Sequence, residues 1–180
     1  MRILSGRWAG HDLTSPGGRV RPTAEDLRGP WLDRLSPHLA GARVLDLFAG
    51  TGALGLEALS RGAKECDFVE NGPGALHALK ANVAKFKLKG HARVFRRDAR
   101  LFPTNLAAGA YDICLADPPY NSKLAIRLAE LWAIRSFAAI LAVEHDAAMS
   151  LPAPPEGATV DRLEHESSAV TIYLKESRSD

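Results

Sequence analysis

Short apolar runs alternate with amphipathic segments from residue 43 onward. The runs at 44–48, 66–69, 92–96, 111–116 and 138–143 have the length of buried strands, and the segments 53–61, 74–87 and 123–132 have helical periodicity. This alternation predicts parallel strands joined by right-handed crossovers. The segments 159–163 and 169–174 alternate apolar and polar residues, which is typical of a closing antiparallel pair. We therefore expect an α/β, Rossmann-like fold with a seven-stranded, mostly parallel sheet and helices on both faces.

The first 23 residues follow a different pattern. Isolated apolar residues are separated by Ser-Gly, Ala-Gly and Pro-Gly-Gly, which predicts a small β-hairpin or arm ahead of a core at 24–180. The basic residues of this arm are Arg2, Arg7, Arg19 and Arg21, and its one acid is Asp12. Such an excess of positive charge suits contact with RNA phosphates, and a solvated arm without a partner is the alternative interpretation.

A helix is expected to begin at Thr23, a residue type suited to the N-cap position, and acids follow in the first turn. Gly29 and Pro30 predict an interruption of this helix, because proline lacks the N–H group and clashes with the preceding turn. Residues 36–42 are then the expected connection to the first central strand.

The strand at 44–48 runs into a glycine loop that opens the next helix. From Gly50 to Gly55 the sequence GTGALG matches the GxGxxG pattern of dinucleotide-binding loops, and Glu70 follows twenty residues after Gly50. A nicotinamide cofactor is therefore one interpretation. Asp46 favours a different cofactor. It ends the strand four residues before the first glycine, where its carboxylate would meet an ammonium group of the ligand. The amino-acid end of S-adenosylmethionine carries such a group.

Four acids each end a different predicted strand: Asp46, Glu70, Asp98 and Asp117. In a doubly wound sheet the ligand lies across the carboxyl ends of the strands, so these acids should share one rim. Glu70 is suited to accept hydrogen bonds from ribose hydroxyls, and Asp98 with the backbone of Ala99 is suited to an adenine amino group. For any single acid, a turn or helix cap is the alternative role.

The stretch Asp117-Pro118-Pro119-Tyr120 has a chemical logic of its own. An exocyclic amine on a nucleobase is a poor nucleophile, since its lone pair is delocalised into the ring. Hydrogen bonds to the Asp117 carboxylate and to the main-chain carbonyl at Pro118 would hold that amine, and Pro118 and Pro119 offer no N–H donors. Tyr120 can stack on a base extruded from its helix or loop. Positioning then carries most of the rate, and neither a metal nor a strong general base is needed.

Composition bounds these interpretations. A chain of 180 residues fits one domain, and no apolar run approaches the ~20 residues that cross a bilayer. The opening residues lack the apolar core of a signal peptide, so we expect a cytoplasmic protein without a membrane partner. Cys66 and Cys114 fall in predicted strands and are expected to be buried thiols, not disulfide or metal ligands. The net charge of +2 is too small to indicate a nucleic-acid partner.

The residues resemble the bacterial 16S ribosomal RNA guanine-N2 methyltransferases of the small ribosomal subunit. The resemblance covers nearly the whole chain and rests on MRILSGRWAG at 1–10, VRPT at 20–23, LDLFAGTGALGLEALSRGA at 45–63, FVE at 68–70, Asp98-Ala99, DPPY at 117–120 and VEH at 143–145. DPPY alone is shared with adenine-N6 and cytosine-N4 DNA methyltransferases, whereas the long glycine-loop signature is more specific. In family members, RPT usually continues into a helix that contains Arg-Glu and then Phe-Asn. In this chain Arg28 is followed by Gly29, which occupies the position of the expected glutamate.

The resemblance implies a class I methyltransferase that uses S-adenosylmethionine and modifies a guanine N2 amine in 16S rRNA, within the small subunit. The implied cofactor-binding residues are Thr23, Asp46, Phe48, Gly50, Thr51, Gly52, Glu70, Asn71, Asp98 and Ala99. It implies no metal, and we expect a monomer. Three alternatives stay open: a DNA adenine-N6 methyltransferase, disfavoured because no DNA-recognition domain is evident, a nicotinamide-dependent oxidoreductase and a non-catalytic RNA-binding module.

Overall fold

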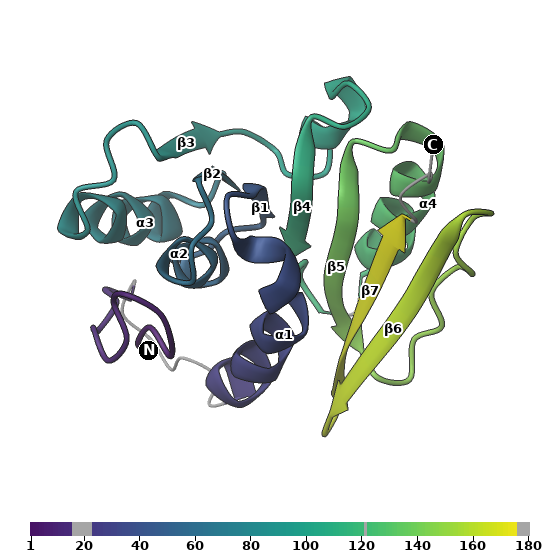
Figure 1. The fold of residues 1–180 in the computed structure, drawn as a ribbon, viewed down its shortest axis with the longest axis horizontal. Coiled ribbons are helices and arrows are strands. Elements are labelled where there is room, and N and C mark those ends of the chain that lie inside the picture. Colours follow the sequence, from purple (N-terminus) through teal and green to yellow (C-terminus); the bar gives the residue numbers. More distant parts are fainter. Residues whose placement is uncertain (16–22, 121, 176–180) are drawn as a thin grey trace.

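The computed structural model describes residues 1–15, 23–120 and 122–175, and of Thr23 and Ala24 only the backbone (Figure 1). The helices are α1 (Thr23–Leu39), α2 (Ala53–Ser60), α3 (Pro73–Lys85), the short 3₁₀ helix η1 (Phe102–Asn105) and α4 (Leu124–Arg135). The strands are β1 (Arg43–Leu47), β2 (Glu65–Glu70), β3 (Ala92–Arg96), β4 (Tyr111–Ala116), β5 (Ala138–Asp146), β6 (Ala158–His165) and β7 (Ser168–Lys175).

All of the strands form one seven-stranded sheet in the order β3-β2-β1-β4-β5-β7-β6. The first five strands in this order are parallel, and β7 pairs antiparallel with both β5 and β6. The predicted fold is thereby confirmed, including the closing antiparallel pair. The strand order reverses between β1 and β4, so the carboxyl ends of these two strands flank the crevice where ligands bind in such sheets.

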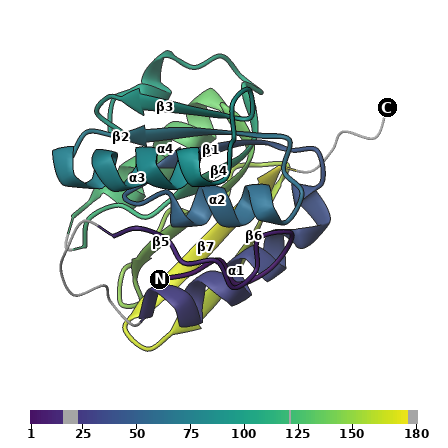
Figure 2. The ribbon, with the colours of Figure 1, turned by 90° about the vertical axis from the view of Figure 1, so that its left-hand side faces the viewer.

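Each face of the sheet has its own apolar core, because successive residues of a strand point to opposite faces. Val44 of β1 packs with the side chains of α1 and α2, including the buried Trp31. Its neighbour Leu45 packs on the other face with α4, including the fully buried Trp132. The helices α1, α2 and α3 lie on the same side of the sheet (Figure 2). The opposite face is covered by α4 and by the single turn η1.

Helix α1 continues through Pro30, so the interruption expected at Gly29-Pro30 is wrong. The helix also extends to Leu39, into the expected connection at 36–42. Leu27, Trp31 and Leu35 recur every four residues and are each no more than 2% exposed. Burying three such side chains stabilises the helix by several kcal/mol, at ~1.5–3 kcal/mol each, which offsets the cost of ~3 kcal/mol for a proline inside a helix.

The first fifteen residues form a loop closed by one antiparallel bridge between Arg2 and Asp12, in place of a regular hairpin. The Ile3 N–H donates to the His11 carbonyl at 2.9 Å, and Ile3 itself is fully buried. Gly6 has φ +82°, and a Cβ there would lie 2.0 Å from the Ser60 carbonyl oxygen at the end of α2. The segment is therefore docked on the core and is not a dangling arm.

Candidate functional site

Three residues with positive φ turn the chain from β1 into α2: Phe48 at +58°, Gly50 at +56° and Gly52 at +83°. A non-glycine residue in this left-handed region costs ~1 kcal/mol or more, and such strain concentrates at ligand sites. At Gly55 a Cβ would lie 2.4 Å from the Phe68 ring, and at Gly52 it would lie 2.5 Å from Leu79. Gly52 and Gly55 are therefore required for close packing of α2 against β2 and α3.

Asp46 supports this loop from beneath. Its side chain is buried, and its Oδ2 accepts a hydrogen bond from the Gly55 N–H at 2.9 Å. Burial raises the pKa of Asp46 to about 7, the Gly55 N–H opposes that shift, and the charges of Asp117 and Glu70 add to it. Three of the four predicted rim acids are thus close enough to influence one another.

The raised pKa of Asp46 predicts how stability depends on pH. Between about 3.8, the ordinary pKa, and about 7, the folded state holds a proton on Asp46 that the unfolded chain has released. This contribution to the free energy of unfolding therefore falls as pH rises through that window and is constant above it. Denaturant unfolding from pH 4.5 to 8 should show that Asp46→Asn removes the fall.

The difference between wild type and Asp46→Asn is the quantity to measure, because His145 acts in the opposite direction. Burial lowers the pKa of His145, so its contribution falls when pH drops below its ordinary value of 6.5. That contribution is common to both proteins and cancels in the difference. A difference that stays constant with pH would contradict the protonated state of Asp46.

Glu70 joins the glycine loop to the turn after β2. Its Oε2 accepts the Gly50 N–H at 2.9 Å, and its Oε1 accepts the N–H groups of Asn71 at 2.8 Å and Gly72 at 2.6 Å. The carboxylate is thereby held in one orientation at the carboxyl end of β2. An anion fixed in this way is preorganised to accept further hydrogen bonds from a ligand.

Asp98 lies two residues beyond the end of β3, at the carboxyl end of the strand. Hydrogen bonds from the Arg100 guanidinium and N–H hold the pKa of the Asp98 carboxyl below its ordinary value. The Asp98 carboxylate is therefore ionised, and both of its oxygens accept hydrogen bonds from Arg100. Ala99, beside Asp98, is buried.

The cavity between these elements has a volume of about 260 Å³. It is lined by Phe48, Val69, Glu70, Asn71, Asp98, Ala99, Arg100, Pro119 and Leu124. Carboxylates on one side and apolar walls on the other fit an adenosine group, whose ribose and amino group donate hydrogen bonds and whose purine prefers apolar contact. Five of the residues implied by the resemblance come together here.

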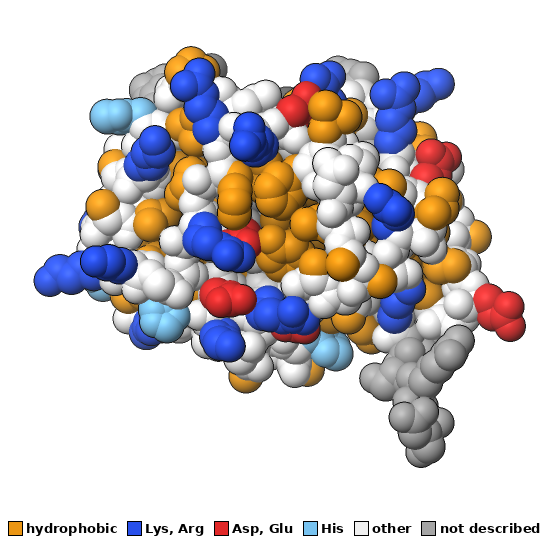
Figure 3. Space-filling view, turned by 90° about the horizontal axis from the view of Figure 1, so that it is seen from above, with side chains coloured by type: hydrophobic (Ala, Val, Ile, Leu, Met, Phe, Trp, Pro, Cys, Tyr) orange, Lys and Arg blue, Asp and Glu red, His pale blue; other side chains and the backbone are white. Residues whose placement is uncertain are grey.

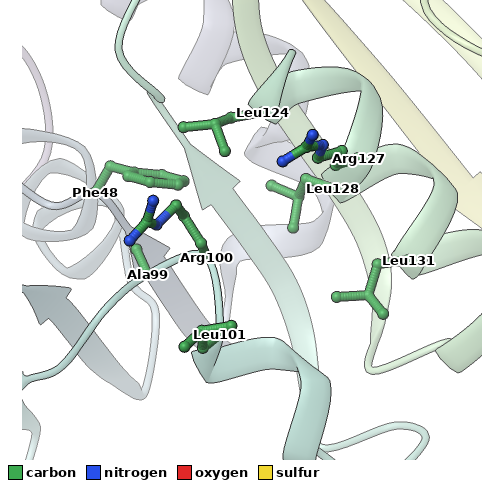
Figure 4. A pocket seen from close by; sticks show the side chains of 8 residues that line it. All are labelled: Phe48, Ala99, Arg100, Leu101, Leu124, Arg127, Leu128 and Leu131. Carbon is green, nitrogen blue, oxygen red and sulfur yellow. The ribbon is translucent and has the colours of Figure 1, made fainter. Parts of the chain in front are cut away.

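A second cavity, of about 380 Å³, adjoins the first and shares four of its lining residues (Figure 4). It extends toward the side chains of Leu101, Arg127, Leu128 and Leu131. These come from α4 on one side and from the segment before η1 on the other. No sequence pattern predicted this cavity, because it depends on how far α4 lies from η1 across the sheet.

The other described cofactor residues that the resemblance implies, Asp46, Gly50, Thr51 and Gly52, belong to β1 and the glycine loop and do not line the 260 Å³ cavity. The Thr51 hydroxyl lies 3.5 Å from the sulfur of Met1, and the Thr51 carbonyl accepts a hydrogen bond from the buried Asn82 side chain at 2.9 Å. Thr51 is thus tied to the N-terminal segment and to α3, and it does not line the 260 Å³ cavity. The side chain of Thr23 lies outside the described residues, as do Arg19 and Arg21.

The DPPY loop begins where β4 ends. Asp117 is exposed, Pro118 is buried, and Pro119 lines the 260 Å³ cavity. Asp117 thus directly follows β4 and lies two residues before Pro119, which lines the candidate cofactor cavity. An exposed carboxylate at this position is suited to accept a hydrogen bond from an amine, and its role stays a prediction.

Tyr120 is anchored at its hydroxyl. The hydroxyl donates to the Glu144 carboxylate on β5 at 2.5 Å and also contacts the Ser168 hydroxyl at the start of β7. Burial and the Glu144 carboxylate raise the pKa of Tyr120 to about 12, so the phenol stays protonated at neutral pH. Sequence reasoning missed both anchors, although Glu144 lies in the VEH stretch; ring stacking on a base stays a prediction.

Arg2 and Arg7 are exposed, as contact with RNA requires, but they are not clustered with the rim acids. The Arg7 guanidinium lies 4.0 Å over the Trp8 ring, which stacks on Phe86 at 4.6 Å. The Arg7 N–H donates to the Ser60 carbonyl, at the end of α2 farthest from the glycine loop. An RNA contact by these arginines stays a prediction.

Within the described residues, no group of His, Cys, Asp and Glu side chains is arranged to hold a metal ion. The two cysteines are free and buried. In the same part of the chain, no helix has the length and apolar character that spanning a bilayer demands.

Comparison with known proteins assigns this chain to a family. The family model described as Conserved hypothetical protein 95 matches residues 1–174. The chain belongs to this family. Among its relatives, ribosomal RNA small subunit methyltransferase D of Escherichia coli (strain K12) is 33% identical over 187 residues, covering all of this chain and 92% of the relative. YlbH of Bacillus subtilis (strain 168) is 32% identical, covering 97% of this chain and 99% of the relative.

Solved structures agree with this family assignment. The Escherichia coli protein yhhF has a TM-score of 0.85 and 31% sequence identity, with 99% of each chain covered. A Thermus thermophilus protein, TTHA0928, has a TM-score of 0.78 and 28% identity over 98% of this chain and 99% of its own. The fold is the Rossmann-like fold of class I S-adenosylmethionine-dependent methyltransferases, as the family resemblance implied.

Proposed function

We propose that this protein transfers a methyl group from S-adenosylmethionine to the exocyclic N2 amine of a guanine in 16S rRNA of the small ribosomal subunit. The observation that carries the proposal is the position of the DPPY loop, whose Pro119 lines the same cavity as Glu70 and Asp98. Relatives named for rRNA methylation that align over at least 97% of this chain support the substrate class.

The chain's own residues have distinct roles in this reaction. Glu70 and Asp98 bind the ribose and the adenine of the cofactor, and the buried Asp46 holds the glycine loop against them. When bound, S-adenosylmethionine supplies an activated methyl group on a sulfonium. Asp117 and the Pro118 carbonyl accept hydrogen bonds from the guanine amine and favour localising its lone pair. Tyr120, fixed by its hydroxyl, presents its ring to the extruded base.

The wider setting is proposed on the same basis. We propose a single methyltransferase domain over residues 1–180, which acts as a monomer in the cytoplasm and needs no metal. The exposed Arg2 and Arg7 contribute RNA contacts from the N-terminal segment. The small subunit, more than naked rRNA, is the expected substrate.

The deciding experiment is methyl transfer from labelled S-adenosylmethionine to small subunits that lack the modification, followed by mapping of the modified base. We expect one guanine in 16S rRNA to be labelled on N2. Cofactor titration is the accompanying measurement, with NADH as the competing ligand. Saturable binding of NADH but not S-adenosylmethionine, or methylation of adenine in DNA, would overturn the proposal.

A further inference from the structure

A groove continues from the candidate cofactor cavity across the face of the sheet that carries α4. Its outer part is lined by Leu101, Arg127, Leu128 and Leu131. Figure 4 shows these side chains converging from the two flanking segments. Leu101 is 62% exposed and is one of three exposed large apolar side chains in the described part of the chain. Exposed apolar surface in a groove with a polar rim is typical of a binding site.

The two segments that flank this groove are strongly basic. Residues 93–105 contain four arginines and one acid, and residues 123–135 contain three Lys or Arg residues and one acid. This local excess of five positive charges stands against a net charge of only +2 for the whole chain. On the corresponding side of the molecule, Lys and Arg side chains surround an apolar hollow (Figure 3). The charge is therefore concentrated on the two segments that flank the groove.

Some of these cations are neutralised within the protein. Arg93 forms an ion pair with Asp67, and Arg100 forms one with Asp98. Others remain available, because Arg97, Lys123 and Arg127 are exposed and form no ion pair with any residue in the described part of the chain. Exposed cations of this kind bind phosphate groups and release counterions when they do so.

We propose that this groove, lined by Leu101, Arg127, Leu128 and Leu131 and flanked along the chain by the exposed Arg97 and Lys123, docks a single-stranded segment of the RNA substrate. Phosphates contact the three cations, and one unpaired base packs against the leucines. Charge complementarity and the mixture of apolar floor and basic rim select this occupant. The inference rests on the proposed function, because it names the surface through which the same enzyme holds its RNA.

The position of the groove fits that role better than the N-terminal segment does. Lys123 follows the DPPY loop by three residues, and Arg127 lies one helical turn further along α4. The groove also joins the candidate cofactor cavity, which Pro119 of the DPPY loop lines. Arg7, in contrast, sits at the far end of α2, an eight-residue helix and therefore about 12 Å long.

The test compares two triple variants with the same change of charge. Arg97→Gln/Lys123→Gln/Arg127→Gln removes the basic rim, and Lys64→Gln/Lys87→Gln/Lys89→Gln removes three exposed cations from the amino edge of the sheet. Binding to small subunits that lack the modification is measured between 50 and 300 mM salt, together with methyl-transfer kinetics. Affinity for S-adenosylmethionine is measured as a control for the fold.

For the groove variant we expect the log–log salt slope to fall by about two units, from ~0.7 per phosphate contact on single strands. Its KM for the subunit should rise about tenfold or more, with kcat at saturation and cofactor affinity unchanged. Leu101→Ser, an exposed substitution, should weaken binding about fivefold without altering the salt slope, as expected for ~1 kcal/mol of lost apolar contact.

A groove variant whose salt slope and KM equal those of the amino-edge variant would overturn the inference. Weaker binding with an unchanged slope would overturn it too, because the partner would then not be a phosphate backbone. These outcomes are separate from failure of the proposed function. If wild type binds subunits through the groove but transfers no methyl group to 16S rRNA, the proposed function fails while the docking surface stands.

Discussion

Replacing Asp117 with alanine should lower the turnover of methyl transfer by about 10²-fold or more, the scale expected when positioning in the transition state is lost. The side chain is exposed beyond the end of β4, so its removal leaves both apolar cores intact. Glu70 and Asp98 would still line the cofactor cavity. We therefore expect the fold and the affinity for S-adenosylmethionine to stay nearly unchanged. Single-turnover methylation of small subunits is the measurement.

Asp112→Ala is the matched control for this prediction. Asp112 lies near the opposite end of the same strand, where it pairs with Arg43 at 3.0 Å and is half-exposed. Its loss should leave turnover unchanged. Because the charge of Asp117 contributes to the raised pKa of Asp46, Asp117→Ala should also lower the pKa of Asp46. Near-normal single-turnover rates in Asp117→Ala would rule out the amine-binding role.

Sequence reasoning was accurate where structure depends on neighbouring residues. The period-two strands, the glycine loop and the alternation of strands and helices are local signals, and they predicted all seven strands of the sheet. It failed at Pro30, because burial of Trp31 and its helical neighbours against the core outweighs the local cost of proline. Gly29 departs from the family pattern, but packing does not require glycine there. A Cβ at this position would lie 3.5 Å from the Leu4 side chain, an ordinary van der Waals distance.

The candidate site was predicted in outline for a similar reason. Acids at strand ends must meet on one rim once the strands are parallel, so Glu70 and Asp98 could be placed from the sequence. The partners of Tyr120 could not, because Glu144 and Ser168 lie 24 and 48 residues away along the chain. The direction of the Asp46 side chain, beneath the loop toward Gly55, likewise depends on how α2 packs.

Contacts between residues far apart in the sequence also determine the position of the N-terminal segment. A buried acid for which no role was predicted holds this segment in place. Glu57 of α2 is fully buried, and its two carboxylate oxygens accept the N–H groups of Leu4 and Ser5, each at 2.8 Å. The Arg61 guanidinium donates to the same carboxylate at 3.0 Å. Arg28, which is also buried, has its Nε 3.9 Å from Glu57. One carboxylate thus joins the segment to α1 and α2.

Replacing Glu57 with alanine should therefore lower the free energy of unfolding by about 3–5 kcal/mol, because it leaves buried guanidinium groups and two N–H donors without their acceptor. Asp33→Ala is the matched control, since Asp33 also pairs with Arg61, at 2.5 Å, but is 69% exposed. Its loss should cost about 1 kcal/mol or less. Denaturant unfolding of both variants measures the contrast, and limited proteolysis should detect release of residues 1–15 in Glu57→Ala alone. Equal losses in the two variants would show that burial of this network does not increase its contribution to the free energy of unfolding.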